Sequence, residues 1–164
     1  LYAGGISSMS KGCYLNPHID NSHDRNLKNF RRLNLLYYVN KDWIPKKDGG
    51  ELVLYPNGIK NKEEIIKCKF NRLLIMRTDN KSIHGVKKIL SKTKRRKCIS
   101  NYYFSMNSPS GKKYYHSTSF RGFKKELLKG TYLQLNSFIR TSIKKFIFTI
   151  SGKSISTNYH KKSD

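Results

Sequence analysis

The chain has 164 residues and carries 34 Lys and Arg against 10 Asp and Glu, a formal net charge of +24. This length suits one domain with a substantial core and excludes a second catalytic unit. Two explanations fit the excess positive charge: a nucleic acid or other polyanion as partner, or lysine-rich codon usage in an AT-rich genome.

The cysteines and the start of the chain bear on its cellular setting. Cys13, Cys68 and Cys98 lack paired spacing, which excludes a disulfide scaffold and indicates a reducing compartment, the cytoplasm. No apolar run approaches the roughly 20 residues that a membrane-spanning helix needs. The chain begins at Leu1 with neither an initiator Met nor a signal-peptide pattern, so we expect that it is truncated at its start.

Short segments rich in β-branched and aromatic residues, separated by turns, predict a mainly β protein whose antiparallel sheet folds on itself. The expected strands cover residues 6–10, 31–40, 51–55, 63–70, 72–78, 84–89 and 96–104. Alternation in the second strand places Asn34, Leu36 and Tyr38 on one face. The run from Leu73 to Met76 is apolar throughout, so we expect this strand to be buried. Trp43 lies in the loop before the next strand and is expected to plug the core.

The first candidate metal ligands lie in the motif His18-Ile19-Asp20, which Pro17 holds extended. Residues one apart on an extended segment project to the same face, so His18 and Asp20 can bind one metal ion. The motif alone is a weak signal, because such tripeptides also occur in surface loops. The neighbouring His23 and Asp24 fall in a polar segment that we expect to be a solvated loop outside the site.

A third ligand comes from far along the chain. His84 opens a short strand, and with His18 and Asp20 it completes the two-histidine, one-carboxylate set that holds non-haem Fe(II) and leaves other coordination positions open. Alternation in the last strand puts Arg96, Ser100 and two further side chains, Cys98 and Tyr102, on one face. An arginine grips a carboxylate through two hydrogen bonds and a serine adds a donor, so this face suits a dicarboxylic co-substrate.

The C-terminal part predicts one long helix. Apolar residues recur at helical spacing between residues 124 and 150, with Lys and Arg between them. We expect this amphipathic helix to cover a sheet, although its basic character also permits contact with a membrane surface. Residues 1–123 would then form the main domain, and residues 151–164 a disordered tail. His116, before the helix, either lines a substrate groove or packs.

The motifs together resemble a known family. The segment from Asn29 to Trp43, with its Tyr37-Tyr38-Val39-Asn40-Lys41-Asp42-Trp43 run, and the segment Gly49-Gly50-Glu51-Leu52 are similar to the central strands of the Fe(II)- and 2-oxoglutarate-dependent dioxygenases, in the prolyl 4-hydroxylase-like branch. The resemblance extends over about residues 4–123 and implies a double-stranded β-helix, or jelly roll. The helices that usually precede the first strand in this family are missing from the chain.

The resemblance also implies roles for the pocket. Arg96, Ser100 and Tyr38 would hold the far carboxylate of 2-oxoglutarate. Met9 stands where many prolyl hydroxylases have a tyrosine, and further lining would come from Leu36, Cys98 and Tyr102. The implied reaction uses Fe(II), O2 and 2-oxoglutarate, with ascorbate as reductant, to hydroxylate a C–H bond and release succinate and CO2. A peptidyl or free proline-type substrate is expected. A nucleic-acid demethylase and a non-catalytic jelly-roll binding module are the alternatives.

Overall fold

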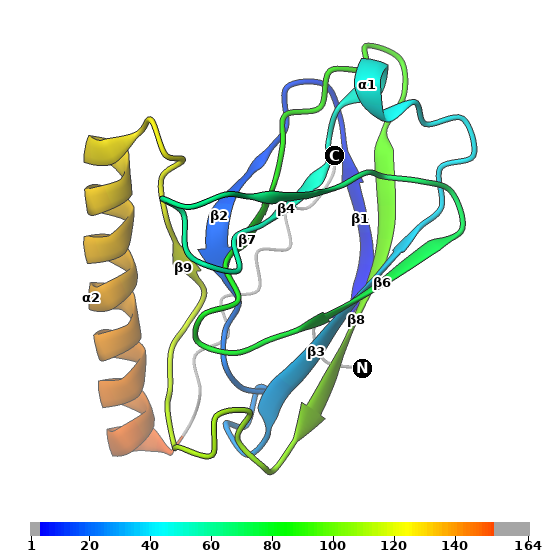
Figure 1. Ribbon diagram of the computed structural model, residues 1–164. Helices are drawn as coiled ribbons and strands as arrows, with labels where there is room; N and C mark the ends of the chain where they lie inside the picture. The colour runs from blue at the N-terminus through cyan, green and yellow to red at the C-terminus, as the bar shows by residue number, and fades with distance from the viewer. Residues whose placement is uncertain (1–3, 153–164) are drawn as a thin grey trace, which may run out of the picture.

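The computed structural model describes residues 4–152. It contains two antiparallel sheets, and successive strands along the chain mostly alternate between them (Figure 1). The four-stranded sheet has the order β1 (Gly5–Met9), β8 (Arg96–Ser105), β3 (Phe30–Tyr38) and β6 (Arg72–Arg77). The five-stranded sheet has the order β5 (Glu64–Ile66), β4 (Leu52–Leu54), β7 (His84–Val86), β2 (Leu15–Ile19) and β9 (Ser119–Phe120). Because the chain passes repeatedly from one sheet to the other, the fold is a jelly roll, and the fold prediction is confirmed.

The core lies where the inner faces of the sheets meet. Its buried cluster contains Tyr38, Trp43, Cys68, Ile89 and Cys98. The indole of Trp43 donates to the Gly49 carbonyl over 3.1 Å, so its polar group is satisfied inside the core. Just after Trp43 the chain makes one turn of helix, α1 (Pro45–Asp48), which the sequence did not predict. Trp43 thus closes the core from a loop, as expected.

The prediction of a buried strand at residues 72–78 is wrong for half of its side chains. Met76 is buried, but Leu73 and Ile75 are 52% and 58% exposed. Strand β6 is the last strand of its sheet and pairs with β3. Its outer side chains have no covering element within residues 4–152, because alternation turns every second residue away from the core.

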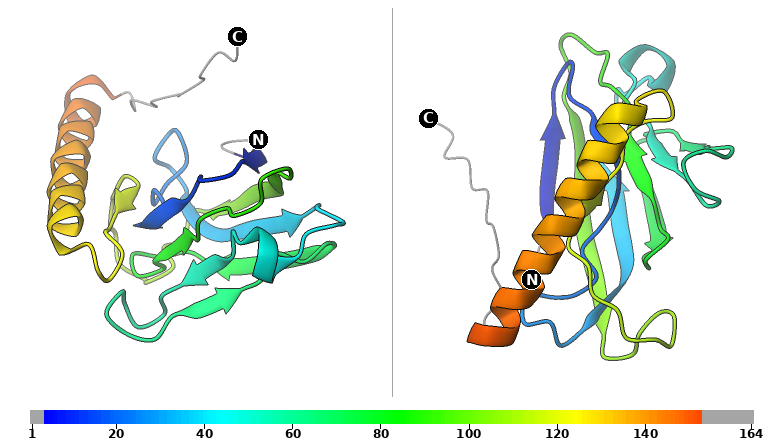
Figure 2. Two further views of the ribbon diagram at one scale, coloured as in Figure 1. Left: turned by 90° about the horizontal axis from the view of Figure 1, so that it is seen from above. Right: turned by 90° about the vertical axis from the view of Figure 1, so that its left-hand side faces the viewer.

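Helix α2 (Leu127–Ser151) lies at the outside of the molecule beside β9, at the edge of the five-stranded sheet (Figures 1 and 2). Its buried residues are Gly130 and Ser137. The apolar side chains that were expected to cover a sheet face away from it, and Leu128 is 90% exposed. That expectation is therefore wrong, because the helical period predicts an apolar stripe but not the direction in which the stripe points.

None of the helices in the described part of the chain has the length and apolar character required to cross a bilayer. Of the expected tail at residues 151–164, residues 153–164 lie outside the described residues.

Candidate metal centre

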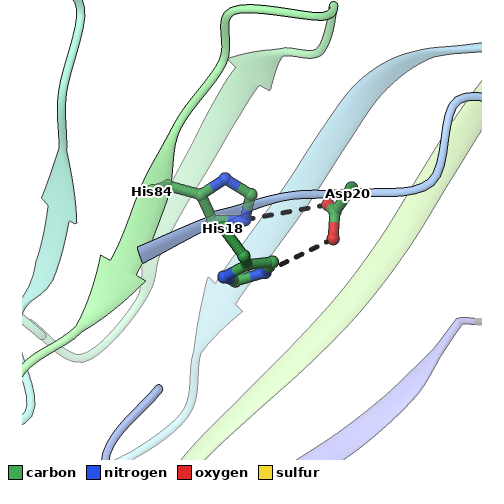
Figure 3. A group of neighbouring side chains, drawn as sticks. All are labelled: His18, Asp20 and His84. Carbon is green, nitrogen blue, oxygen red and sulfur yellow. Dashed lines mark ion pairs between the residues drawn. The ribbon is translucent and has the colours of Figure 1, made fainter. Parts of the chain in front are cut away.

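Strand pairing brings His18, Asp20 and His84 together (Figure 3). His18 lies near the end of β2 and pairs directly with His84, the first residue of the antiparallel strand β7. Asp20 follows the end of β2, and Ile19 between the two ligands is buried. The one-apart spacing of His18 and Asp20 therefore projects both side chains toward the partner histidine, as extended geometry requires.

The ring nitrogens are oriented for metal binding. Nδ1 of His18 lies 2.9 Å from the Asn16 carbonyl, and Nδ1 of His84 lies 3.0 Å from the Ser82 carbonyl. A carbonyl can only accept, so each Nδ1 carries the proton and each Nε2 keeps its lone pair. The two Nε2 atoms lie 3.5 Å and 3.7 Å from the carboxylate oxygens of Asp20.

These donors fit a shared cation. All three ligand atoms lie within 4.8 Å of one another. Two nitrogen lone pairs facing a carboxylate in a buried site repel one another unless a positive charge lies between them. Two imidazoles and one carboxylate on one side suit a first-row metal such as Fe(II), with the opposite positions open.

Neighbouring groups hold the ligands in a metal-binding protonation state. Burial disfavours the charged form of Asp20, but the positive charge of the Arg31 guanidinium stabilises it, and the pKa of Asp20 lies well below its usual range. Arg31 is 3.1 Å from Asp20, and the side-chain amide of Asn34 donates to the same carboxylate over 3.2 Å. Burial and the nearby His18 lower the pKa of His84 to about 4, so this ring is neutral near pH 7.

Arg96 forms a second polar centre deeper in the fold. It is 3% exposed, and its guanidinium donates to the Cys68 sulfur over 3.2 Å and to the Tyr38 hydroxyl over 3.4 Å. A longer contact of 3.8 Å reaches the sulfur of Met9. Burial raises the pKa of both Tyr38 and Cys68, so neither supplies a negative charge. Within residues 4–152, no carboxylate lies within ion-pair distance of Arg96.

The pairing of β3 with β8 orders the pocket face from the metal to Arg96. Opposite one another lie Asn34 and Tyr102, then Leu36 and Ser100, then Tyr38 and Cys98. Asn34 contacts the ligand Asp20 and Tyr38 contacts Arg96, so the Leu36 and Ser100 level lies between the two centres.

The structure does not bring Ser100 to Arg96. The two residues are four apart on one strand, about 13 Å along it. The Ser100 hydroxyl instead donates to the Gly5 carbonyl over 3.3 Å. Ser100 was predicted from its face alone, and alternation gives the face of a side chain but not its distance from a ligand. We therefore leave Ser100 out of the carboxylate-binding set.

The family-model comparison matches residues 4–104 to the 2OG-Fe(II) oxygenase superfamily. The chain belongs to this superfamily. Its name states the iron and 2-oxoglutarate on which its members depend, and the His18, Asp20 and His84 donor set is compatible with that iron.

The relatives of this oxygenase-family chain include two proteins named Egl nine homolog 1. Egl nine homolog 1 of Homo sapiens is 32% identical over 112 residues, which are 68% of this chain and 24% of the human protein. The Mus musculus protein of the same name is 32% identical over 110 residues, or 67% of this chain and 26% of the mouse protein. The chain thus spans about a quarter of these relatives.

A solved structure is similar as well. It is a prolyl hydroxylase from Trichoplax adhaerens, in complex with a peptide fragment of the hypoxia inducible factor oxygen degradation domain. It shares 31% sequence identity with this chain at a TM-score of 0.50, over 63% of this chain and 46% of that one.

Several members of the oxygenase site were missed at the sequence level. Arg31, which contacts Asp20, also stacks over the Tyr102 ring at 4.0 Å. Asn34 was placed on the pocket face by alternation, but nothing in the sequence assigned it to Asp20. Cys68 lies in the loop after β5 and reaches Arg96 only through folding. For Arg31 and Asn34, the signal in the sequence that could have indicated the site was a polar residue at an inward-facing position of a strand.

Of two further histidines near the site, His23 differs from expectation, and His116 takes one of the two roles expected of it. His23 is not in a solvated loop: it is buried, bonded through Nδ1 to the Ser22 hydroxyl at 2.7 Å, and its ring lies 4.2 Å from that of Phe30. It lies outside the metal-ligand group. His116 packs against Tyr114, with ring centroids 5.6 Å apart.

Proposed function

We propose that the protein is an Fe(II)- and 2-oxoglutarate-dependent dioxygenase that hydroxylates a proline-type residue. The reaction consumes O2 and 2-oxoglutarate and releases succinate and CO2, so that one oxygen atom enters the substrate C–H bond and the other enters succinate. Ascorbate serves as the reductant that keeps the iron in its ferrous state. Family membership and the similar prolyl hydroxylase from Trichoplax adhaerens support the proposal.

The observation that carries the proposal is the buried, uncompensated charge of Arg96. A guanidinium that is 3% exposed and, among residues 4–152, contacts sulfur, a hydroxyl and the Tyr38 ring but no carboxylate is costly without an anion. The anion belongs on the side toward His18, Asp20 and His84, because the β3 and β8 ladder runs from one centre to the other. A dicarboxylate reaching from the metal to Arg96 satisfies both centres.

Each protein group has a positioning task. Arg96 would take the far carboxylate through its planar fork, and Tyr38 would add a hydroxyl donor, since its raised pKa keeps it protonated. Met9, Leu36 and Cys98 pack around this end and exclude water. At the other end, Arg31 and Asn34 fix the carboxylate of Asp20. When bound, the iron and the keto acid supply the oxidising chemistry, and the protein supplies orientation and a dry pocket.

A peptidyl substrate is the first choice. The similar Trichoplax protein was solved in complex with a peptide fragment, which supports a peptide as the substrate. Free proline remains the second arm of the test. The net charge alone favours a nucleic acid as substrate or partner, so we do not include it in the proposal. The three free cysteines support a reducing compartment, the cytoplasm.

The test is succinate formation by the full-length protein with Fe(II), ascorbate and 2-oxoglutarate. Proline-containing peptides, free proline and no substrate are compared, and peptides are expected to give the largest increase. His84→Ala should abolish turnover. His23→Ala is the matched control, because His23 is also a buried histidine anchored by one hydrogen bond but lies outside the ligand group. Equal turnover in the two variants, or no succinate with any substrate, would overturn the proposal.

A further inference from the structure

Helix α2 is held to the molecule by a small and polar face. The Ser137 hydroxyl accepts from the Phe120 backbone NH over 3.1 Å and donates to the Leu133 carbonyl over 2.7 Å. The hydroxyls of Thr141 and Ser117 lie 2.7 Å apart. Gly130 lies against Gly122. A Cβ atom added to either glycine would contact the backbone of the other. These contacts fix the rotation of the helix about its own axis.

The opposite side of α2 is apolar and exposed. At about 100° per residue, seven apolar residues fall within an arc of about 80° on the side away from Ser137. We call them the outward stripe: Leu128, Tyr132, Leu135, Ile139, Ile143, Phe146 and Ile150. Each is at least 48% exposed, and Leu128 reaches 90%. The outward stripe runs about 33 Å along the helix.

Positive charge borders the outward stripe. Lys129 and Arg140 lie along one side of it on the helical wheel, and Lys145 lies toward the other. One nitrogen of Arg140 donates inward to the Thr118 carbonyl over 3.3 Å, so Lys129 and Lys145 are the charges that face outward. Lys124 and Lys125 lie just before the helix, and between Leu127 and Ser151 there is no Asp or Glu, although Glu126 at the start of the helix pairs with Lys129 over 2.8 Å. A second copy of the helix would bring like charges together, which disfavours pairing of two stripes.

We propose that the outward stripe docks on an anionic membrane surface, with α2 lying in the plane of the interface. The apolar side chains enter the acyl boundary, while the Lys and Arg stems extend to the anionic headgroups. Aromatic residues within the stripe suit this boundary. Figure 2 shows α2 standing at the outside of the molecule, so the jelly roll does not obstruct its outward side. Anionic lipid attracts the basic borders that disfavour a second copy.

The experiment is flotation of the full chain with vesicles of phosphatidylcholine, with or without phosphatidylserine. Binding is expected with phosphatidylserine at low salt, and it should weaken in high salt because part of the attraction is electrostatic. The test variant is the double substitution Ile139→Gln and Ile143→Gln. The partition coefficient should fall by about tenfold or more, since two apolar side chains lose their burial.

A matched control uses the same chemical change elsewhere. Ile65 and Ile75 lie on β5 and β6 and are 47% and 58% exposed, against 48% and 52% for Ile139 and Ile143. Ile65→Gln with Ile75→Gln should leave vesicle binding within about twofold, because these side chains lie outside the docking surface. Circular dichroism and the melting temperature check that both double variants fold.

Four results would overturn the proposal. The first is equal binding to both kinds of vesicle at low salt, and the second is an equal loss in both double variants. The third is a dimer in sedimentation velocity that the Ile139 and Ile143 variant dissociates, with no flotation of either form, which assigns the outward stripe to a second copy. The fourth is a lowered melting temperature confined to that variant, which places the stripe inside the folded full-length protein.

Discussion

Arg96 is the buried charge on which the ligand preference of the site depends. Arg96→Lys keeps a positive charge but loses the planar fork, so 2-oxoglutarate should bind more weakly by about 1.5–3 kcal/mol, or roughly tenfold or more. Metal binding should persist, because His18, Asp20 and His84 are unchanged. Calorimetric titration of 2-oxoglutarate in the presence of an inert divalent metal measures the difference.

Arg95→Lys is the internal control for this prediction. Arg95 lies next to Arg96 in the chain but is exposed, and its Nε donates to the Ser8 hydroxyl over 2.9 Å. We expect its substitution to leave the affinity for 2-oxoglutarate nearly unchanged. If both variants bind 2-oxoglutarate as tightly as the unsubstituted protein, Arg96 does not hold the far carboxylate.

The sequence placed individual residues on the correct face but not at the correct distance. His18 and Asp20 come together because extended geometry forces alternate side chains to one side. His84 joins them only through the pairing of β2 with β7, which the local spacing of His18 and Asp20 does not show. Ser100 shares a face with Arg96 yet contacts Gly5. Arg31 was missed because its partner Asp20 is 11 positions away and contact follows from folding.

At the level of single elements, the contact between α2 and the segment after β9 predicts opposite effects on stability for alanine at its two glycines, Gly122 and Gly130. A Cβ on Gly122 would lie 2.5 Å from the Glu126 carbonyl oxygen and 2.8 Å from the backbone of Gly130. Gly122→Ala should therefore destabilise the protein by about 1–3 kcal/mol, the usual cost of overpacking. Neither partner can move away easily, since both contacts are with backbone atoms.

The same substitution at the other glycine, Gly130, should not destabilise the protein. A Cβ on Gly130 would lie 3.4 Å from the Gly122 nitrogen, an ordinary contact, and alanine favours a helix interior by about 0.8–1 kcal/mol over glycine. Gly130→Ala should leave stability unchanged or raise it by up to about 1 kcal/mol. Urea unfolding of the two variants measures both effects. An unfolding free energy that Gly122→Ala leaves unchanged would show that α2 does not pack at this glycine pair.

The same helix shows how far periodicity extends as a guide. Its spacing predicted an amphipathic helix, and α2 covers most of the expected residues. The period cannot say which neighbour the stripe meets, and here the contacting residues are Ser137, against Phe120 of β9, and Gly130, against Gly122 after it. Short side chains of this kind carry little hydrophobic signal, so the true contact face could not be predicted. Strand β6 has the same property: Leu73 and Ile75 belong to an apolar run, yet their side chains are exposed.

Over the whole molecule, the jelly roll was predictable because its strands, turns and central motifs agree with one family pattern. The net charge did not help to predict the fold, but it affects the stability of the molecule. Of the 34 Lys and Arg, only a few meet an acidic partner, since the chain has 10 Asp and Glu and the described residues contain five ion pairs of a Lys or Arg with a carboxylate. Unpaired positive charges on a compact body repel one another and reduce its stability.

Salt should therefore stabilise this protein. Added ions shorten the screening length from about 10 Å at 0.1 M to about 3 Å at 1 M, which weakens the repulsion among exposed lysines. The same ions weaken exposed ion pairs such as that of Lys87 with Glu63, but pairs of this kind contribute only about 0–1 kcal/mol each. Repulsion has the larger effect at +24, so the melting temperature should rise by several degrees, at about 2–4 °C per kcal/mol for a domain of this size. Calorimetry in sodium chloride and in potassium chloride measures the rise, and the two salts should agree because screening does not depend on the cation. A melting temperature that falls with both salts would mean that attraction between paired charges, rather than repulsion among unpaired ones, controls the stability of the molecule.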